Sequence, residues 1–415
     1  MTRHLSQRAQ QGSPSRALRR MRPLLPDASG AAPSRKAHQA AGPAGGHASL
    51  AEQIRTARAS NPAVEFWLDS HPRIHAPDTP ACDAVADTLG HYGESAAGSG
   101  QLAAQLTGVT TNPILIEEYD AVVRQRTPAS VPRSAANRDT CYHTHIASAA
   151  EAMSALHRAS DGRYGWVSAQ VSPAHTFDTR AIVDEGLRLA ALADNVMVKV
   201  PGSQEGYRAI EHLVGCGVSV NGTLSFSLAQ FETFAVAVAA GRGRLSGSEN
   251  DRVRTVVTHM TGRVGDAVRA FSGPAPLDIR SIRLAEAVLA RRGAELVGEI
   301  EPRSSILLSS VRVDPGAAEE CLHLTATLDK PVAYTIKPET YVALECVDTA
   351  GVFRGQPGLL DEVDAVGITA THELIRPLFN RNLPPDQFWA IPQFLQTLAE
   401  ASSSHLKLIG GVHAA

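Results

Sequence analysis

Lysine is scarce in this chain: its 415 residues include 34 arginines but only five lysines. A lysine amine can lose its proton and act as a nucleophile, whereas an arginine stays protonated, so each lysine is worth locating. The lysines are Lys36, Lys199, Lys330, Lys337 and Lys407. Cysteine is scarce too. The five cysteines are scattered and form no CxxC pair, which favours reduced thiols in a cytoplasmic protein over a disulfide scaffold.

Long apolar runs are also lacking. No run reaches the roughly 18 residues of a membrane span, and nothing near Met1 resembles the apolar core of a signal peptide. We therefore expect neither a membrane partner nor secretion. Aromatic residues make up only 5% of the chain, and the part after residue 50 carries 31 basic against 41 acidic side chains. An acidic body without a basic stripe argues against nucleic acid as a partner.

Residues 1–48 differ from the rest in composition. They are rich in Arg, Ala, Gly, Pro, Ser and Gln and show no apolar period, so they cannot bury enough surface to offset chain entropy. We predict a disordered tail over 1–48 and a folded body over 49–415. An Arg-rich, acid-poor N-terminus is also typical of an organelle transit peptide. The same bias runs through the whole chain, which favours an irrelevant or mis-assigned extension, and Met21 is an alternative start.

From Val64 onward, apolar β-branched runs alternate with helix-like stretches. Eight candidate strands fall at 64–69, 105–113, 164–173, 195–202, 217–227, 253–263, 304–312 and 322–328. This alternation predicts an α/β fold with a parallel sheet, and at this length a (β/α)8 TIM barrel. A doubly wound open sheet is the alternative, although its glycine-rich phosphate-binding pattern is missing from the first strand–helix turn. Residues 384–410 are expected to form helical cover over the barrel mouth.

Lys199 is embedded in one of these apolar runs, NVMVKVPG (195–202). Strand alternation puts Lys199 on the same face as Met197 and two valines on the other, so an inward ammonium would be desolvated. Its pKa would then fall from about 10.4 toward neutrality, and a neutral amine on a rigid strand can form a Schiff base with a ketone. A lysine that reaches solvent or pairs with a carboxylate is the competing interpretation. Lys337, in VAYTIKPE, has a similar setting.

Polar residues at the ends of the other candidate strands suit a sugar phosphate. Asp69 closes an apolar run, as an inward carboxylate that moves a proton would. Asn221 and Thr223 alternate on one face, which suits hydrogen bonds to a polyol. Taken singly, each has an ordinary explanation, such as a helix cap, a polar turn or a surface ion pair. The guanidinium and hydroxyl groups of the kind that hold a phosphate are Arg263, Ser310 and Arg312.

Seven motifs resemble the transaldolase family in their order and spacing. They are FWLDS (66–70), GVTTNP (108–113), WVSAQVSP (166–173), NVMVKVPGSQEGYRAI (195–210), GVSVNGTLSFSLAQFE (217–232), THMTGR (258–263) and SSVR (309–312). The resemblance covers roughly residues 60–400. It implies a class I aldolase-type barrel whose Schiff-base lysine lies on the fourth strand, here Lys199. The family moves a dihydroxyacetone unit from a ketose phosphate to an aldose phosphate without metal or cofactor, so we expect sugar-phosphate substrates.

The resemblance also implies a role for each matching residue. Lys199 would attack the C2 carbonyl of the substrate. Asp69 would take the proton of the C4 hydroxyl during cleavage and return it when the acceptor adds. Thr223 would position the water that relays protons while the Schiff base forms and breaks. The residues implied to bind the substrate, the last three of them at its phosphate, are Thr110, Asn112, Asn221, Thr258, Arg263, Ser310 and Arg312.

Two positions depart from the transaldolase pattern. Gln170 stands where the family has a glutamate that acts through water as general acid and base, and an amide cannot replace it at neutral pH. The fructose-6-phosphate aldolase branch also has glutamine there and glycine at the position of Gly222, but it uses a sixth-strand tyrosine where this chain has Met260. Three alternatives stay open: a transaldolase-type enzyme with an altered relay through His259 or another group, a specialised aldolase or transferase on an unusual sugar phosphate, or a weakly active sugar-phosphate-binding barrel.

The segment CYHTH (141–145) invites a metal interpretation. Its histidines lie only two positions apart and no carboxylate follows at ligand spacing, so we expect a solvated or packing role and no metal site. A homodimer is compatible with the sequence.

Overall fold

The computed structural model describes residues 49–75, 83–91, 96–126, 138–270, 279–311, 324, 326–345 and 374–410. The predicted tail, 1–48, lies outside the described residues. Among the described helices, none combines the length and the apolar character that a membrane crossing requires.

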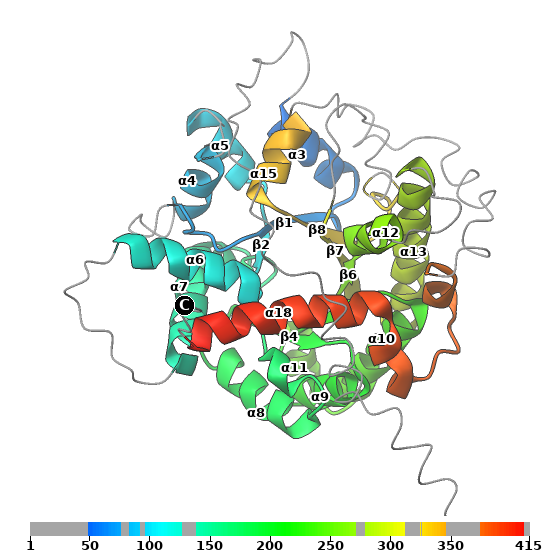
Figure 1. The fold of residues 1–415 in the computed structure, drawn as a ribbon. Coiled ribbons are helices and arrows are strands. Elements are labelled where there is room, and N and C mark those ends of the chain that lie inside the picture. The colour runs from blue at the N-terminus through cyan, green and yellow to red at the C-terminus, as the bar shows by residue number, and fades with distance from the viewer. Residues whose placement is uncertain are drawn as a thin grey trace, which may run out of the picture. The chain divides into compact units, whose positions relative to one another are not determined.

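Eight parallel strands close into a barrel in sequence order (Figure 1). The strands are β1 (Glu65–Asp69), β2 (Gly108–Thr110), β3 (Trp166–Gln170), β4 (Val196–Pro201), β5 (Val220–Ser225), β6 (Thr255–Met260), β7 (Ser304–Ser309) and β8 (Val332–Ile336). Pairing of β8 with β1 completes the ring. The predicted TIM barrel is therefore confirmed, and the open doubly wound alternative was wrong.

The eighth strand predicted at 322–328 was wrong as well. The described residues of that segment, 324 and 326–328, form a helical residue and turns, and β8 begins only at Val332. Leu324 is fully buried, and its carbonyl accepts a hydrogen bond of 3.2 Å from the hydroxyl of Tyr334 on β8. The apolar residues Leu324 and Ala326 are thus buried outside the strands, and apolar alternation alone cannot distinguish such burial from a strand.

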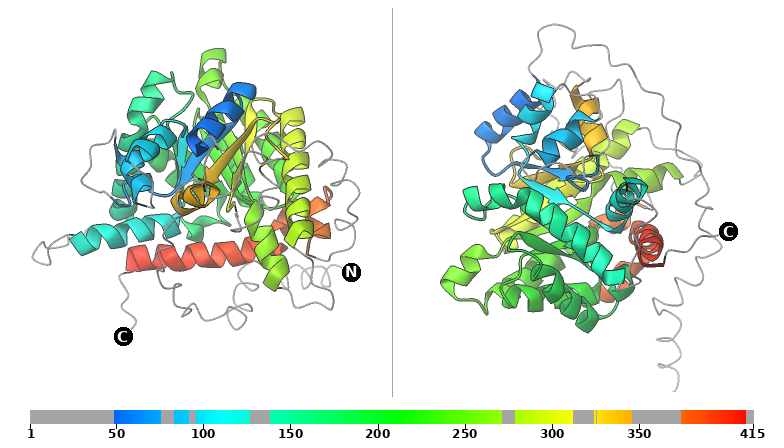
Figure 2. Two further views of the ribbon diagram at one scale, coloured as in Figure 1. Left: turned by 90° about the horizontal axis from the view of Figure 1, so that it is seen from above. Right: turned by 90° about the vertical axis from the view of Figure 1, so that its left-hand side faces the viewer.

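The helices surround the barrel in the order expected for a (β/α)8 fold (Figure 2). The α-helices are α3 (Leu50–Ser60), α4 (Ala84–Gly90), α5 (Ala96–Ala103), α6 (Pro113–Arg126), α7 (Arg138–Ala159), α8 (Thr179–Ala190), α9 (Gln204–Gly215), α10 (Leu228–Arg242), α11 (Gly247–Arg252), α12 (Thr261–Ala270), α13 (Ile279–Ile300), α15 (Pro338–Glu345) and α18 (Pro392–Gly410). Short 3-10 helices are η1 (Pro173–His175), η4 (Arg376–Phe379) and η5 (Pro385–Ala390).

Side-chain caps fix where several helices begin. Ser203 caps α9 by accepting a hydrogen bond from the Gly206 amide at 3.0 Å. At the start of α10, Ser227 and Gln230 form a reciprocal capping box. Both helices begin directly after the C-terminal ends of β4 and β5, so the caps position the two strand ends that carry Lys199 and Thr223.

The barrel interior is closed on one side by a cluster of buried apolar side chains. This floor consists of Trp67, Trp166, Met197, Val256, Leu307 and Ala333, one from each of six strands. Gly108 on β2 makes room for the largest of them, because a Cβ at this position would lie 2.5 Å from the Trp67 ring. Two residues further along β1 and β4 come Asp69 and Lys199, so the floor separates these polar groups from the opposite end of the barrel.

Helix α18 lies over the other end of the barrel (Figure 1). Its His405 Nε2 is 3.1 Å from the hydroxyl of Ser172, which follows β3, and its Glu400 pairs with Arg263, which follows β6. Because both partners lie just past C-terminal strand ends, α18 spans the C-terminal mouth. The predicted helical cover is confirmed.

Candidate active site

Lys199 lies inside the barrel on β4, with only 5% of its surface exposed. In the sheet register it stands between Gln170 of β3 and Asn221 of β5, and its Nζ donates to the Thr111 carbonyl at 3.3 Å. Burial lowers the pKa of Lys199 from 10.5 to about 8, and the carboxylate of Asp69 opposes this shift. At neutral pH, the fraction of Lys199 in the neutral amine form is therefore about 300 times that of a lysine with the ordinary pKa.

Lys337, the competing lysine, is far less enclosed. Its side chain is 43% exposed, and its Nζ lies 3.7 Å from the carboxylate of Glu339 on α15. Burial therefore separates the two lysines that the sequence leaves in competition.

Asp69 ends β1 and accepts a hydrogen bond from one threonine hydroxyl, which in turn contacts a second threonine. Thr110 on β2 donates to Asp69 Oδ1 at 2.8 Å, and the Thr110 and Thr335 hydroxyls are 2.5 Å apart. Since a hydroxyl has one proton, Thr110 uses its own for Asp69 and must accept from Thr335. The chain of donors fixes the orientation of the carboxylate at the barrel mouth.

Asn221 is the centre of a second network on the opposite side of Lys199. Its Nδ2 donates to Ser168 Oγ at 3.0 Å, and its Oδ1 accepts from Thr258 Oγ1 at 2.6 Å. Ser168 completes the set by donating to the sulfur of Met197 at 3.8 Å. The sequence analysis missed Ser168, although strand alternation places it on the same face of β3 as Gln170.

The segment between β2 and α6 serves the site mainly through its backbone. Asn112 Oδ1 accepts from the amides of Ile114 and Leu115 at 2.9 and 3.0 Å, which caps α6. Thr111 gives its carbonyl to Lys199, and its hydroxyl donates to the Ser168 carbonyl at 2.6 Å. The predicted contact of Asn112 with substrate would therefore use its Nδ2 group.

The side chains of Gln170 and Thr223 lie on the inner face of the barrel, as the strand alternation predicts. Gln170 is 5% exposed. The Tyr142 hydroxyl on α7 donates to the backbone carbonyl of Gln170 at 2.9 Å and accepts from its backbone N–H at 3.0 Å. Thr223 is fully buried on β5. His259 lies elsewhere: its ring meets Phe231 of α10 edge-on at 5.3 Å, in the layer between barrel and helices. That position excludes His259 as a direct replacement for the missing glutamate.

The predicted phosphate clamp is only partly within the described residues. Arg263, in the first turn of α12, donates to the Glu400 carboxylate of α18 at 2.5 Å. Ser310 follows β7 with a φ of 56°, a left-handed conformation that non-glycine residues adopt at a cost. Arg312 lies outside the described residues. Glu400 was not predicted from the sequence, and its carboxylate pairs with Arg263, an arginine expected to bind phosphate.

The buried face of α18 is polar over the mouth. Gln393, Thr397 and Glu400 follow one another at helical spacings of four and three, so they share a face. Gln393 and Thr397 are nearly fully buried, and both polar atoms of the Gln393 side chain and the Thr397 hydroxyl lack a hydrogen-bond partner in the described structure. Buried polar groups in native proteins are normally hydrogen-bonded, so these are groups that a bound polyol can satisfy.

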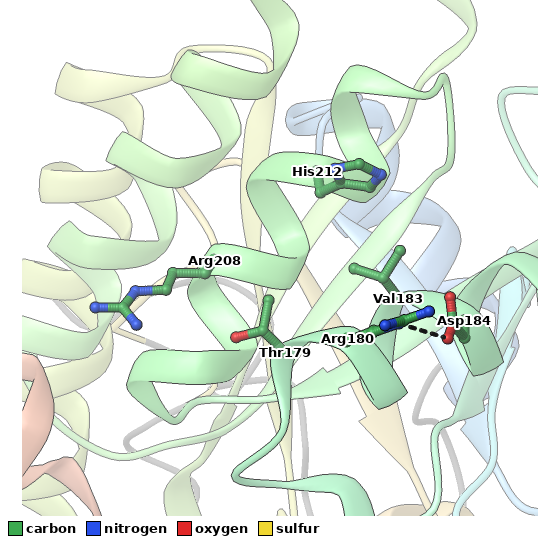
Figure 3. A pocket seen from close by; sticks show the side chains of 6 residues that line it. All are labelled: Thr179, Arg180, Val183, Asp184, Arg208 and His212. Atoms are coloured by element: carbon green, nitrogen blue, oxygen red, sulfur yellow. Dashed lines mark ion pairs between the residues drawn. The ribbon is translucent and has the colours of Figure 1, made fainter.

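A surface pocket lies elsewhere, between α8 and α9 (Figure 3). Its volume is about 440 Å³, and its lining residues are Thr179, Arg180, Val183, Asp184, Arg208 and His212. None of the predicted site residues lines it, and its Arg180–Asp184 pair at 3.8 Å is largely exposed. We assign the chemistry to the barrel mouth instead.

The fold and this interior define a (β/α)8 barrel protein with a buried lysine at the C-terminal mouth. A family model described as Transaldolase/Fructose-6-phosphate aldolase matches residues 94–342, and the chain belongs to this family. The resemblance to transaldolases in the sequence is thereby confirmed.

Individual relatives are transaldolases of bacteria. The transaldolase of Thiobacillus denitrificans is 35% identical over 175 residues, which are 40% of this chain and 49% of that protein. Transaldolase 1 of Streptomyces avermitilis is 30% identical over 229 residues, 51% and 54% of the two chains. The transaldolase of Renibacterium salmoninarum is 27% identical over 292 residues, 63% and 76% of the two. The chain thus spans about half the length of the first two relatives.

Replacing Glu400 with glutamine tests whether Arg263 belongs to an anion site. The substitution removes the carboxylate that an incoming phosphate must displace, so we expect inorganic phosphate to bind roughly three- to tenfold more tightly, by isothermal titration calorimetry. Glu232→Gln is the matched control, because Glu232 forms an exposed pair with Arg381 at 2.9 Å. Equal phosphate affinity in wild type and Glu400→Gln contradicts this account.

Proposed function

We propose that this protein is a transaldolase-type transferase that moves a dihydroxyacetone unit between sugar phosphates through a Schiff base on Lys199. The observation that carries the proposal is the enclosed amine of Lys199, whose pKa is lowered to about 8 by burial. The amide residues Gln170 and Asn221 stand in register beside it on the neighbouring strands, and the carboxylate of Asp69 lies on β1. Family membership supports the reaction class.

We propose the following sequence of steps for these groups. The neutral Lys199 amine attacks the C2 carbonyl of the ketose phosphate, and loss of water gives a protonated imine. Asp69, oriented by Thr110, takes the proton of the C4 hydroxyl while the C3–C4 bond breaks and an aldose phosphate leaves. The electron pair of the broken bond moves into the imine, which leaves an enamine on Lys199. Addition of a second aldose phosphate reverses these steps.

We propose that groups on two sides of the barrel mouth position the substrate. The Asn221 amide group, already aligned by Ser168 and Thr258, is suited to a hydroxyl of the dihydroxyacetone unit. Arg263 would exchange its Glu400 partner for the terminal phosphate of the substrate. Such fixed contacts lower the entropy cost of bringing the carbonyl to the amine.

The groups available to relay protons around the imine favour a second candidate function. Water loss and return at C2 need a group that moves protons, and Gln170 offers only an amide there. Thr223 can hold a water but does not change its charge state. These groups suit an aldolase or a transferase on an unusual sugar phosphate with a slow Schiff-base step, or a barrel that binds sugar phosphates with weak turnover.

Borohydride reduction in the presence of fructose 6-phosphate tests the covalent step. We expect a trapped adduct on the peptide that contains Lys199, identified by mass spectrometry, because only the neutral amine adds to the ketone. Lys337→Arg should trap normally and Lys199→Arg should not. An adduct on Lys337, or none with any ketose phosphate, overturns the proposal.

The same reaction mixture distinguishes transfer from simple aldol cleavage. Erythrose 4-phosphate is offered as acceptor, and a transferase forms product only when it is present. Release of free dihydroxyacetone without acceptor supports the aldolase candidate. Trapping without turnover under either condition supports the binding barrel.

Substitution of Gln170 by glutamate tests the relay. A carboxylate at this position can move protons through water, so we expect kcat of the transfer reaction to rise about tenfold or more. Gln170→Met is the control of similar size that neither holds nor relays a water. A Gln170→Glu rate equal to wild type shows that the relay is not the limiting defect.

A further inference from the structure

Three side chains of different type converge beside the barrel, on α6 and α7. Among the described residues, Asp120, Cys141 and His145 are the set whose potential metal ligands all lie within 4.8 Å of one another. The His145 Nε2 atom is 3.4 Å from Cys141 Sγ and 3.2 Å from Asp120 Oδ1. The third side of the triangle, from Cys141 Sγ to Asp120 Oδ1, measures 3.5 Å.

These separations match the edges of a tetrahedral coordination sphere. Bonds of about 2.0–2.3 Å to sulfur, nitrogen and oxygen at tetrahedral angles place the ligand atoms about 3.3–3.6 Å apart. A catalytic triad has a different geometry, because its imidazole uses one ring nitrogen for the thiol and the other for the carboxylate. Here a single nitrogen, Nε2 of His145, faces both partners.

Neighbouring groups contact the Asp120 carboxylate and the His145 residue. Arg124, one turn after Asp120 on α6, pairs with Oδ2 of that carboxylate and leaves Oδ1 toward the triangle. The His145 ring lies edge-on to Tyr119 at 5.0 Å, and the ring of His71 contacts the His145 carbonyl at 3.0 Å. Such outer contacts orient metal ligands in proteins.

We propose that Asp120, Cys141 and His145 form a binding site for a divalent transition metal ion of the zinc class, with water as fourth ligand. The ion would join α6 to α7. Asp120 lies two turns into α6, roughly 10–12 Å along the helix from Asn112, so the ion takes no part in the Schiff-base chemistry. Binding converts the Cys141 thiol to a thiolate and releases its proton to solvent.

The sequence did not predict this arrangement of three ligands. The expectation of a packing role for 141–145 rested on the two histidines, whereas Cys141 and His145 share one face of α7 at a spacing of four. The carboxylate comes from Asp120, which is 21 positions before Cys141 and on another helix. No ligand spacing along the chain indicates such a partner.

Titration of the chelator-treated full-length protein with Co²⁺ tests the proposal. Cobalt bound to a cysteine thiolate gives a charge-transfer absorption in the near ultraviolet, which we expect to saturate at one ion per chain. Cys141→Ser should abolish the band and weaken binding about 100-fold or more, because it removes the sulfur ligand. Cys216→Ser, at an exposed cysteine, and His143→Ala, on the same helix, should leave the band unchanged.

Thermal unfolding gives a second readout that does not depend on absorption. Zn²⁺ should raise the midpoint in the wild-type protein and leave it unchanged in His145→Ala and Cys141→Ser. No charge-transfer band, or a band that persists in Cys141→Ser, means that the three side chains are an ordinary hydrogen-bond cluster and overturns the proposal. Neither readout uses enzyme activity, so the result is independent of the proposed function.

Discussion

Burial of one amine is the constraint on which the rest of this structure depends. Lys199 lies in a closed barrel above the apolar floor, where a charged ammonium loses its hydration. The barrel must therefore supply polar partners without restoring full solvation. It does so with the Thr111 carbonyl and with a carboxylate, Asp69, that opposes the lowering of the lysine pKa. Desolvation prevails, and the amine is pushed toward the neutral form that the proposed chemistry needs.

Helix α18 contributes to the same constraint from above. By crossing the C-terminal mouth it keeps bulk water from the interior, and it brings Glu400 to Arg263. The helix thus encloses the site and also provides the carboxylate that pairs with Arg263. Its polar face, with Gln393 and Thr397, suits a substrate rich in hydroxyl groups better than a sealed core.

Much of the fold and the central residue of the site could be predicted from local pattern. The alternation around Lys199 indicates an inward lysine, and strands alternating with helices indicate the barrel, because both follow from the two-residue period of a strand. The same pattern misplaced the last strand, because Leu324 and Ala326 are apolar and buried without belonging to a strand. Glu400 and Asp120 could not be predicted, because each meets its partner only when two separate helices pack together.

The pH dependence of Lys199 reactivity tests the central claim most directly. Reductive methylation with formaldehyde and cyanoborohydride can be followed by mass spectrometry over pH values of about 6 to 11, with exposed Lys407 as the internal reference for reagent access. The structure predicts a midpoint for Lys199 of about 8. A midpoint near the ordinary value of 10.5 would contradict the desolvated amine and the Schiff-base chemistry built on it.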